Sequence, residues 1–305
     1  RGSHNRIDLG PMEHPARLRV GIVGAGRVGA VLGAALVRAG HEVAGVYAVS
    51  QASRDRAAEL LPGVPVVDLP RAVSGHDLVL LAVPDDALAD LVAGLVATGA
   101  IEAGQLVAHT SGRHGIGVLE PVRSAHALPL ALHPAMTFSG TAMDLDRLAD
   151  CAFGVTAPRA LRELAMALVL DMGGTPVWVE EEQRVTYHAA LAHSANHLVT
   201  LIAQALDVLD AADVEQPDLV LGPLVRAALD NALRLRDGAL TGPVSRGDVG
   251  TVDAHLSALE AISPEIRRTY VALARATAVR ALDSGRLRPA QAEPLLDTLA
   301  DQETS

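Results

Sequence analysis

The chain contains no lysine, because all 25 of its basic residues are arginine. A lysine Schiff base and a lysine general acid are therefore excluded from its chemistry. Cysteine is also scarce: Cys151 stands alone, which excludes a disulfide within the chain and leads us to expect a cytoplasmic protein. Long apolar runs are missing too, and none approaches the ~18 residues of a membrane span, so we expect a soluble globular protein.

Positive charge is in short supply, since the formal net charge is −11. This balance argues against a general surface for nucleic acid or for anionic membranes. Residues 1–11 resemble the remnant of an expression tag, and Met12 is the expected native start. The remaining length suits one large domain or two ordinary ones.

A glycine-rich turn is the most informative segment. An apolar run over residues 18–23 ends in Gly24-x-Gly26-x-x-Gly29, and a helical pattern follows directly. In a dinucleotide site the first glycine forms the tight turn, the second admits the pyrophosphate, and the third allows close packing of helix on strand. The helix N-terminus then offers N–H groups to the phosphates. We therefore predict that the cofactor is bound by Gly24, Gly26, Arg27, Val28 and Gly29.

The first half of the chain alternates strands and helices. Continuous apolar runs predict further strands at residues 42–47, 64–67, 78–83, 105–109, 127–132, 152–156 and 176–179. This alternation predicts an α/β domain with a doubly wound, mostly parallel sheet over residues 12–182. Only helices are expected afterwards, at residues 183–212, 218–237, 251–262, 264–283 and 289–300. Residues 183–305 therefore form a predicted all-α domain.

The end of the second strand indicates which dinucleotide binds. NAD sites usually carry a carboxylate there, but this chain has Ser50, Ser53 and Arg54 at and just beyond that point. Two hydroxyls and a guanidinium suit a 2′-phosphate, so NADP is the predicted cofactor. The alternative for Arg54 is a solvated residue at a helix start. Val83, Pro84 and Ser111 follow later strands, and we expect them at the cofactor as well.

The segment of residues 184–197 carries a polar cluster on a predicted helix. His188 or His193 could donate a proton to a carbonyl or imine that receives hydride, because histidine titrates near neutral pH. Asn196 could hold a substrate carboxylate or hydroxyl. The alternatives are that these histidines cap the helix or face solvent, or that His193 and His197 bind a metal. Because no third ligand is obvious, we predict no metal site.

Further polar residues follow strands and turns. His133 comes directly after the sixth strand, where open α/β sheets bind ligands, and a substrate contact is predicted for it. The rigid turn over residues 240–248 presents Thr241 and Arg246, which could grip an anionic substrate. Ordinary turn formation explains the same residues equally well.

Taken in order, these motifs resemble a known family. They are the segments 24–29, 83–85, 109–112, 133–134, 187–188 with Asn196, and 240–248. They are similar to Rossmann-type oxidoreductases whose helical second half is a domain of unknown function. That family sits beside ketopantoate reductases, pyrroline-5-carboxylate reductases and β-hydroxyacid dehydrogenases. The resemblance implies a helical domain like that of 6-phosphogluconate dehydrogenase, and a homodimer formed through it.

One departure bears on the chemistry that the resemblance implies. Ketopantoate reductases and β-hydroxyacid dehydrogenases carry a lysine four residues before an asparagine, and here Ala192 precedes Asn196. We expect NADPH-dependent reduction of a small carboxylated ketone, ketopantoate first, with substrate held between the domains by Asn196, Thr241 and Arg246. An imine reductase of the pyrroline-5-carboxylate type and a non-catalytic NADP sensor remain alternatives.

Overall fold

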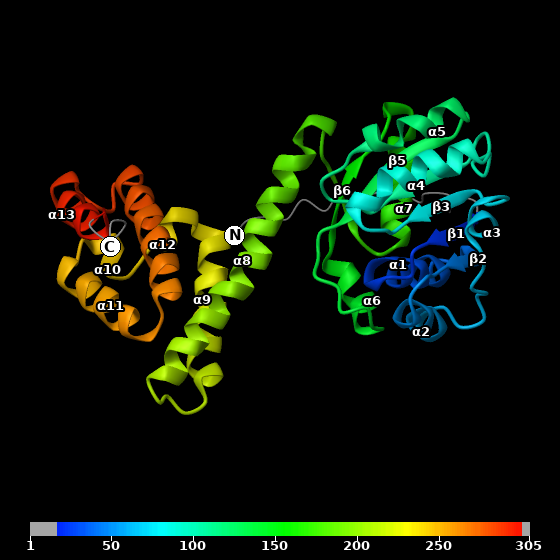
Figure 1. Cartoon of the computed structure of the whole chain (residues 1–305). Coiled ribbons are helices and arrows are strands. Elements are labelled where there is room, and N and C mark those ends of the chain that lie inside the picture. Colours follow the sequence, from blue (N-terminus) through cyan, green and yellow to red (C-terminus); the bar gives the residue numbers. More distant parts are fainter. Residues whose placement is uncertain (1–16, 301–305) are drawn as a thin grey trace, which may run out of the picture. The chain divides into compact units, whose positions relative to one another are not determined.

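A computed structural model describes residues 17–300, so the expected tag remnant at residues 1–11 lies outside the described part. The chain divides into two compact units, one ending at His193 and one beginning at Ser194 (Figure 1). The division falls inside α8 (Arg184–Ala211), whose first ten residues therefore belong to the first unit.

The first unit is built on a seven-stranded sheet of order β2-β1-β3-β4-β5-β6-β7. The β5–β6 pair is antiparallel and the other neighbours are parallel, which confirms the predicted doubly wound, mostly parallel sheet. The strands are β1 (Arg19–Val23), β2 (Glu42–Tyr47), β3 (Leu78–Leu81), β4 (Leu106–His109), β5 (Leu128–Pro134), β6 (Ala152–Thr156) and β7 (Thr175–Trp178).

The strand predicted at residues 64–67 is wrong. This segment makes one isolated bridge, Val46 to Val66, and β2 forms the edge of the sheet. Pro65 lies in its middle and has no N–H to donate to a ladder. Asp68 then caps α3 directly, so the chain turns away after two backbone hydrogen bonds to Val46.

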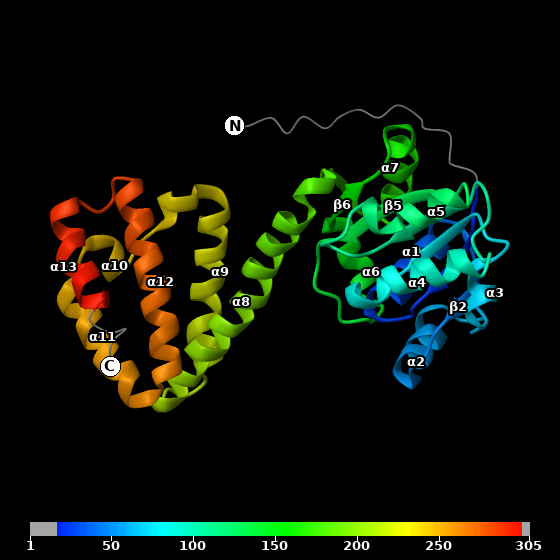
Figure 2. The ribbon, with the colours of Figure 1, turned by 45° about the horizontal axis from the view of Figure 1, so that its top comes forward.

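Helices cover both faces of this sheet (Figure 2). One hydrophobic core contains Ile22 and Leu80 of the strands together with buried residues of α1 and α7, and the other contains Val23 and Leu81 with those of α3, α4 and α5. Successive strand residues therefore point to opposite faces, as continuous apolar strands require. The helices are α1 (Arg27–Arg38), α2 (Gln51–Leu60), α3 (Leu69–Val73), α4 (Asp85–Ala97), α5 (Glu120–Ser124), α6 (Met143–Arg147) and α7 (Arg162–Asp171).

The second unit is helical, as predicted. Besides the rest of α8 it contains α9 (Pro217–Leu235), α10 (Pro243–Arg246), α11 (Val249–Ile262), α12 (Pro264–Asp283) and α13 (Pro289–Ala300). Ser263 caps α12 by accepting a hydrogen bond from Ile266 N–H, and Pro264 occupies the first turn. A core of α10 to α13 buries residues such as Val252, Leu256 and Leu295. Within residues 17–300, no helix combines the length and apolar character needed to cross a membrane.

Candidate functional site

The glycine-rich turn has the geometry that a dinucleotide site requires. Gly24 has φ +100°, and a Cβ there would collide with the Ala82 carbonyl. A Cβ at Gly29 would meet the Gly24 carbonyl and the Ala82 side chain, so α1 packs closely on the strands. The space around Gly26 is open for 4 Å, and Gly26 provides no side-chain cap for α1. The backbone N–H groups at this helix start are thus accessible, and the residues fit a bound pyrophosphate.

Polar groups follow β2 without a carboxylate among residues 47–50. Ser50 caps α2, with its hydroxyl accepting from Ser53 N–H at 3.2 Å. Arg54 is exposed, and its Nε lies 3.4 Å from the Ala48 carbonyl. These residues stand where the sequence predicted a site for a 2′-phosphate.

Arg56, which no sequence motif indicated, adds a cation beside the glycine-rich turn. Its Nη1 donates to the Ala25 carbonyl at 3.2 Å. A Cβ at Gly140 would lie 2.7 Å from Arg56 Nε and 2.9 Å from Arg27 Cγ, so both arginines pass close to the Gly140 backbone. In the sequence, Arg54 stands nearer than Arg56 to the end of β2, and it was therefore the predicted contact to the 2′-phosphate.

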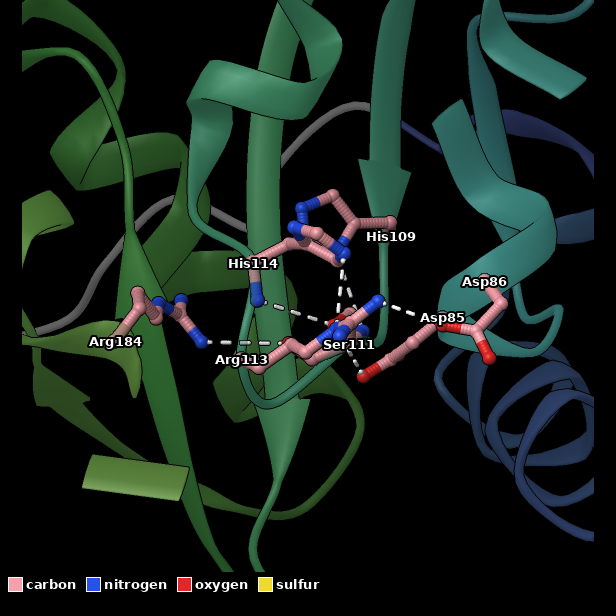
Figure 3. Close-up of polar contacts among 7 residues, drawn as sticks. All are labelled: Asp85, Asp86, His109, Ser111, Arg113, His114 and Arg184. Atoms are coloured by element: carbon pink, nitrogen blue, oxygen red, sulfur yellow. Dashed lines mark hydrogen bonds and ion pairs between the residues drawn. The ribbon is translucent and has the colours of Figure 1, made fainter. Parts of the chain in front are cut away.

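The start of α4 is tied to the loop after β4. Arg113 reaches Asp85 at 3.4 Å and Asp86 at 2.8 Å, both in the first turn of α4 (Figure 3). Val83 lies against the glycine-rich turn, since a Cβ at Gly24 would be 3.4 Å from Val83 Cγ1. Pro84 is exposed and precedes α4.

The loop after β4 is held by His109 and Ser111. His109 is fully buried, and its Nδ1 accepts from Ser111 N–H at 3.1 Å. Its Nε2–H can then donate to the Gly115 carbonyl at 2.7 Å. Burial lowers the pKa of His109 to about 4, so this imidazole is neutral near pH 7. The Ser111 hydroxyl accepts from His114 N–H, and the loop is therefore ordered by its own polar groups (Figure 3).

Arg184, the first residue of α8, is 1% exposed, and its side chain reaches β5, β6 and the loop after β4. Its guanidinium donates to Thr156 Oγ1 at 2.7 Å. Three backbone carbonyls also accept from it: Gly154 at 3.0 Å, Ala131 at 3.1 Å and Ser111 at 3.5 Å. Burial lowers the pKa of Arg184 to about 10, which leaves it charged. No motif in the sequence indicated a role for this residue.

Next to Arg184, three side chains form an aromatic cluster of His133, Tyr187 and His188. His133 Nδ1 lies 3.0 Å from Tyr187 Oη, and the His133 ring stands edge-on to both neighbours, with centroid distances of 5.6 Å to Tyr187 and 5.9 Å to His188. Burial and the charge of Arg184 lower the pKa of His133 to about 4. Burial raises the pKa of Tyr187, so its phenol keeps its proton.

Two glycines make room for this cluster. Gly154 is the register partner of His133 on β6, and a Cβ there would lie 2.5 Å from Tyr187 Oη. A Cβ at Gly112 would lie 2.5 Å from His188 Cδ2 and 2.9 Å from His133 Nε2. The structure thus brings His133 and His188 together, as a shared site would require, and adds Tyr187 to them.

The other predicted site residues lie further along the chain. His193 is exposed and ends the first unit, whereas Asn196 is exposed on α8 in the second unit. Arg246 is exposed at the end of α10. Asp248 caps α11 by accepting from Thr251 N–H, which gives this part of the turn a structural role.

Thr241 borders an apolar cavity of about 580 Å³ within the second unit. Its polar wall includes Tyr270, whose Oη lies 3.0 Å from His255 Nδ1. Arg246 is not among the lining residues. Among residues 17–300, no three potential metal-ligating His, Cys, Asp or Glu side chains are grouped together.

Two family models match the chain. A Rossmann-like domain matches residues 7–134, and the domain of unknown function DUF2520 matches residues 151–277. The chain therefore joins a Rossmann-like domain to a DUF2520 domain, which confirms the resemblance that the motifs indicated. No curated protein matches the chain in sequence.

Solved structures share the fold along most of the chain. A proposed NADP oxidoreductase from Bacteroides fragilis is 24% identical, with a TM-score of 0.71 over 86% of this chain and 98% of that one. An imine reductase from Myxococcus stipitatus in complex with NADP+ is 21% identical, with a TM-score of 0.64 over 91% and 99%. A pyrroline-5-carboxylate reductase from Coxiella burnetii is 19% identical, with a TM-score of 0.52 over 94% and 97%. At these identities the likeness concerns the fold.

Proposed function

We propose that this protein is an NADPH-dependent reductase of a small carboxylated ketone, with ketopantoate as the substrate to test first. The observation that carries the proposal is the 3.0 Å contact between Tyr187 Oη and His133 Nδ1 at the carboxyl end of β5. Open α/β sheets bind ligands at this edge, and burial raises the pKa of Tyr187, so a protonated phenol lies there. The NADP-binding proteins among the structural neighbours support the choice of cofactor.

Residues of three segments would hold the cofactor. The turn from Gly24 to Gly29 would bind the pyrophosphate, and Ser50, Ser53 and Arg54 would bind the 2′-phosphate. Arg56 is a further candidate because it already contacts that turn. Val83, Pro84 and Ser111 would line the path toward the nicotinamide, which supplies a hydride when bound.

The proton would come from Tyr187. Its phenol can donate to a carbonyl oxygen that gains negative charge. Neutral His133 can then return a proton from Nδ1 to the phenolate while its Nε2 takes up a proton from solvent. His133 itself is a poor acid at pH 7, because its pKa of about 4 leaves it neutral. His188 packs on His133 and remains a second candidate donor, and His193 a third. For the substrate carboxylate, Asn196, Thr241 and Arg246 remain candidates.

An imine reductase is the second candidate function, favoured by the Myxococcus and Coxiella neighbours. NADPH oxidation at 340 nm should be followed with ketopantoate, pyrroline-5-carboxylate and related ketones and imines. Tyr187→Phe should lower kcat for ketones by about 100-fold or more. NADPH binding without turnover of any compound would indicate a non-catalytic NADP sensor and refute the proposal.

A matched control is available for the Tyr187 variant. Tyr270→Phe removes a hydroxyl that also lies 3.0 Å from a histidine Nδ1, but in the second unit. We expect this control to keep its kcat. His188→Ala and His193→Ala complete the set, and unchanged kcat in both would leave Tyr187 as the donor.

We also propose that the protein is a cytoplasmic homodimer that associates through its helical domain. Large apolar side chains of α8 and α9 are exposed, with Val199 at 70% and Leu233 at 77%, and no residue of α9 is buried. Exposed apolar surface of this kind is typical of association sites. The cytoplasmic location is supported by the single cysteine, Cys151, which is unpaired and buried.

A further inference from the structure

The guanidinium of Arg184 carries a buried positive charge, and the hydrogen bonds that it donates go to neutral oxygen atoms. Its four acceptors are the Thr156 hydroxyl and the carbonyls of Gly154, Ala131 and Ser111. Carbonyl and hydroxyl dipoles solvate a cation but leave its net charge in place. The side chain is 1% exposed, so water screens this charge weakly.

The charged groups around Arg184 offset this positive charge only in part, because the charge of Arg184 still lowers the pKa of His133 and opposes the rise in the pKa of Tyr187. Glu181 acts on Arg184 and favours its charged form, while the Glu181 carboxylate itself accepts hydrogen bonds from Ile116 N–H at 2.7 Å and Gly117 N–H at 2.9 Å. Asp85 is paired with Arg113, and its charge acts on His109 and His133 less strongly than that of Arg184. His109 and His133 are neutral at pH 7, and His114 and His188 add no negative charge.

This charge also lies close to the proposed proton donor. The Arg184 Cζ atom is 5.9 Å from the centroid of the Tyr187 ring, and the Gly154 carbonyl that accepts from Arg184 belongs to the residue against which Tyr187 packs. A reacting group that contacts Tyr187 Oη would therefore lie in the field of Arg184.

We propose that Arg184 sets the substrate class of the reductase, favouring carbonyl compounds, whose reacting group is uncharged, over protonated imines. The inference rests on the proposed reductase function and goes beyond it, because it names the residue that distinguishes ketones from protonated imines. Arg184 acts here as a specificity-determining residue through its charge, and Tyr187 as the group that contacts the substrate.

The two reductions differ in the sign of the charge at the reacting atom. When hydride adds to a ketone carbon, the C=O π pair moves to oxygen, and that oxygen takes the Tyr187 proton. NADPH is oxidised in this step and the ketone is reduced to an alcohol. An iminium ion enters already cationic, takes hydride at carbon, and its π pair moves to nitrogen without a further proton. A fixed cation stabilises the first transition state and opposes binding of the second substrate.

The test compares kcat/KM for ketones and for cyclic imines in the full chain with NADPH. The unmodified protein should prefer ketones, and Arg184→Gln should lower the ketone-to-imine ratio by roughly 10- to 100-fold. Arg184→Lys keeps the charge and should keep the preference. A loss of general integrity lowers both activities together, so the ratio separates a charge effect from a structural one. An unchanged ratio in Arg184→Gln, or an imine preference in the unmodified protein, overturns the proposal.

A binding measurement on the unmodified, NADPH-loaded protein covers the case in which Arg184→Gln does not fold. Calorimetry would compare N,N-dimethylpyrrolidinium, a permanent cation, with 1,1-dimethylcyclopentane-type neutral analogues of the same shape. We expect the cation to bind at least about tenfold more weakly, and equal or tighter binding of the cation overturns the inference. This result stands even if neither substrate class is turned over, which would refute the reductase function alone.

Discussion

Replacing Gly154 by alanine should disturb Tyr187 and leave the nucleotide-binding turn intact. Gly154 faces His133 across the antiparallel β5–β6 pair, and Tyr187 packs over it. The new Cβ would lie 2.5 Å from Tyr187 Oη, 2.7 Å from Cζ and 3.0 Å from Cε1. Ordinary contacts between such atoms begin near ~3.5 Å, so the ring must withdraw by about 1 Å.

A withdrawal of this size is large enough to break the Tyr187–His133 hydrogen bond. The bond measures 3.0 Å, and a lengthening of about 0.6 Å or more takes it out of hydrogen-bonding range. Overpacking of a well-filled core costs about 1–3 kcal/mol. In a domain of this size each kcal/mol lowers Tm by about 2–4 °C, so a fall of about 2–12 °C is expected.

Thermal unfolding, NADPH affinity and kcat should be measured together for Gly154→Ala. We expect a lower Tm, unchanged NADPH affinity and at least a tenfold lower kcat for ketones, since a positioned acid contributes about 10²–10⁴ to the rate. Gly94→Ala is the matched control, because Gly94 lies in the exposed part of α4 with no atom within 4 Å of the new Cβ. It should raise stability by about 0.5–1 kcal/mol and leave kcat unchanged.

A double variant tests whether the two residues act as one unit. If Gly154→Ala lowers kcat only by moving the Tyr187 hydroxyl, then adding it to Tyr187→Phe should lower kcat no further. Additive losses would show that Gly154 acts elsewhere. An unchanged kcat in Gly154→Ala, with the expected fall in Tm, would refute the role given to the Tyr187–His133 contact.

Three further predictions concern other parts of the molecule. Arg54→Ala should weaken NADPH binding about tenfold or more and leave NADH binding unchanged, whereas the control Arg123→Ala on α5 should affect the binding of neither nucleotide. Equal losses of affinity for both nucleotides in Arg54→Ala would contradict the 2′-phosphate assignment. The pKa of His109 is about 4 in the folded chain and near 6.5 in an unfolded one, so the unfolded state binds more protons between these values. The contribution of His109 to the free energy of unfolding should therefore fall by on the order of 3 kcal/mol as pH drops from about 6.5 to about 4. Urea titrations of His109→Gln should show a fall in stability that is smaller by about this amount. Light scattering should find a dimer that Val199→Asp and Leu233→Asp convert to monomers, and an unmodified protein that is monomeric at micromolar concentration would refute the proposed interface.

The glycine-rich turn could be predicted from sequence because its requirements are local. Gly24, Gly26 and Gly29 act within six residues, and the strand before and the helix after them were readable from apolar periodicity. The strand at residues 64–67 failed for an equally local reason, since Pro65 interrupts the donor pattern. That strand was predicted from its apolar side chains, without regard to the missing N–H of Pro65.

The cluster around Tyr187 could not be predicted in the same way. Helical periodicity sorts residues by the face of their own helix, whereas the partners of Arg184 and Tyr187 are backbone carbonyls and a histidine on distant strands. Gly112 and Gly154 allow the close approach, but in the sequence they look like any small residue. The register of β5 against β6, which pairs His133 with Gly154, exists only once the sheet has formed.

The absence of lysine explains why two residues, Arg184 and Tyr187, would be needed at the proposed site. A lysine ammonium combines a positive charge and a transferable proton on one nitrogen, and Ala192 stands where the resemblance places such a residue. Arginine cannot replace it alone, because Arg184 stays protonated even with its pKa lowered to about 10. Tyr187 has a proton to give but no charge. We infer that the two tasks are divided here, with the charge fixed on Arg184 and the proton carried by Tyr187. Removing either residue alone should therefore impair a different property: substrate class for Arg184 and ketone turnover for Tyr187.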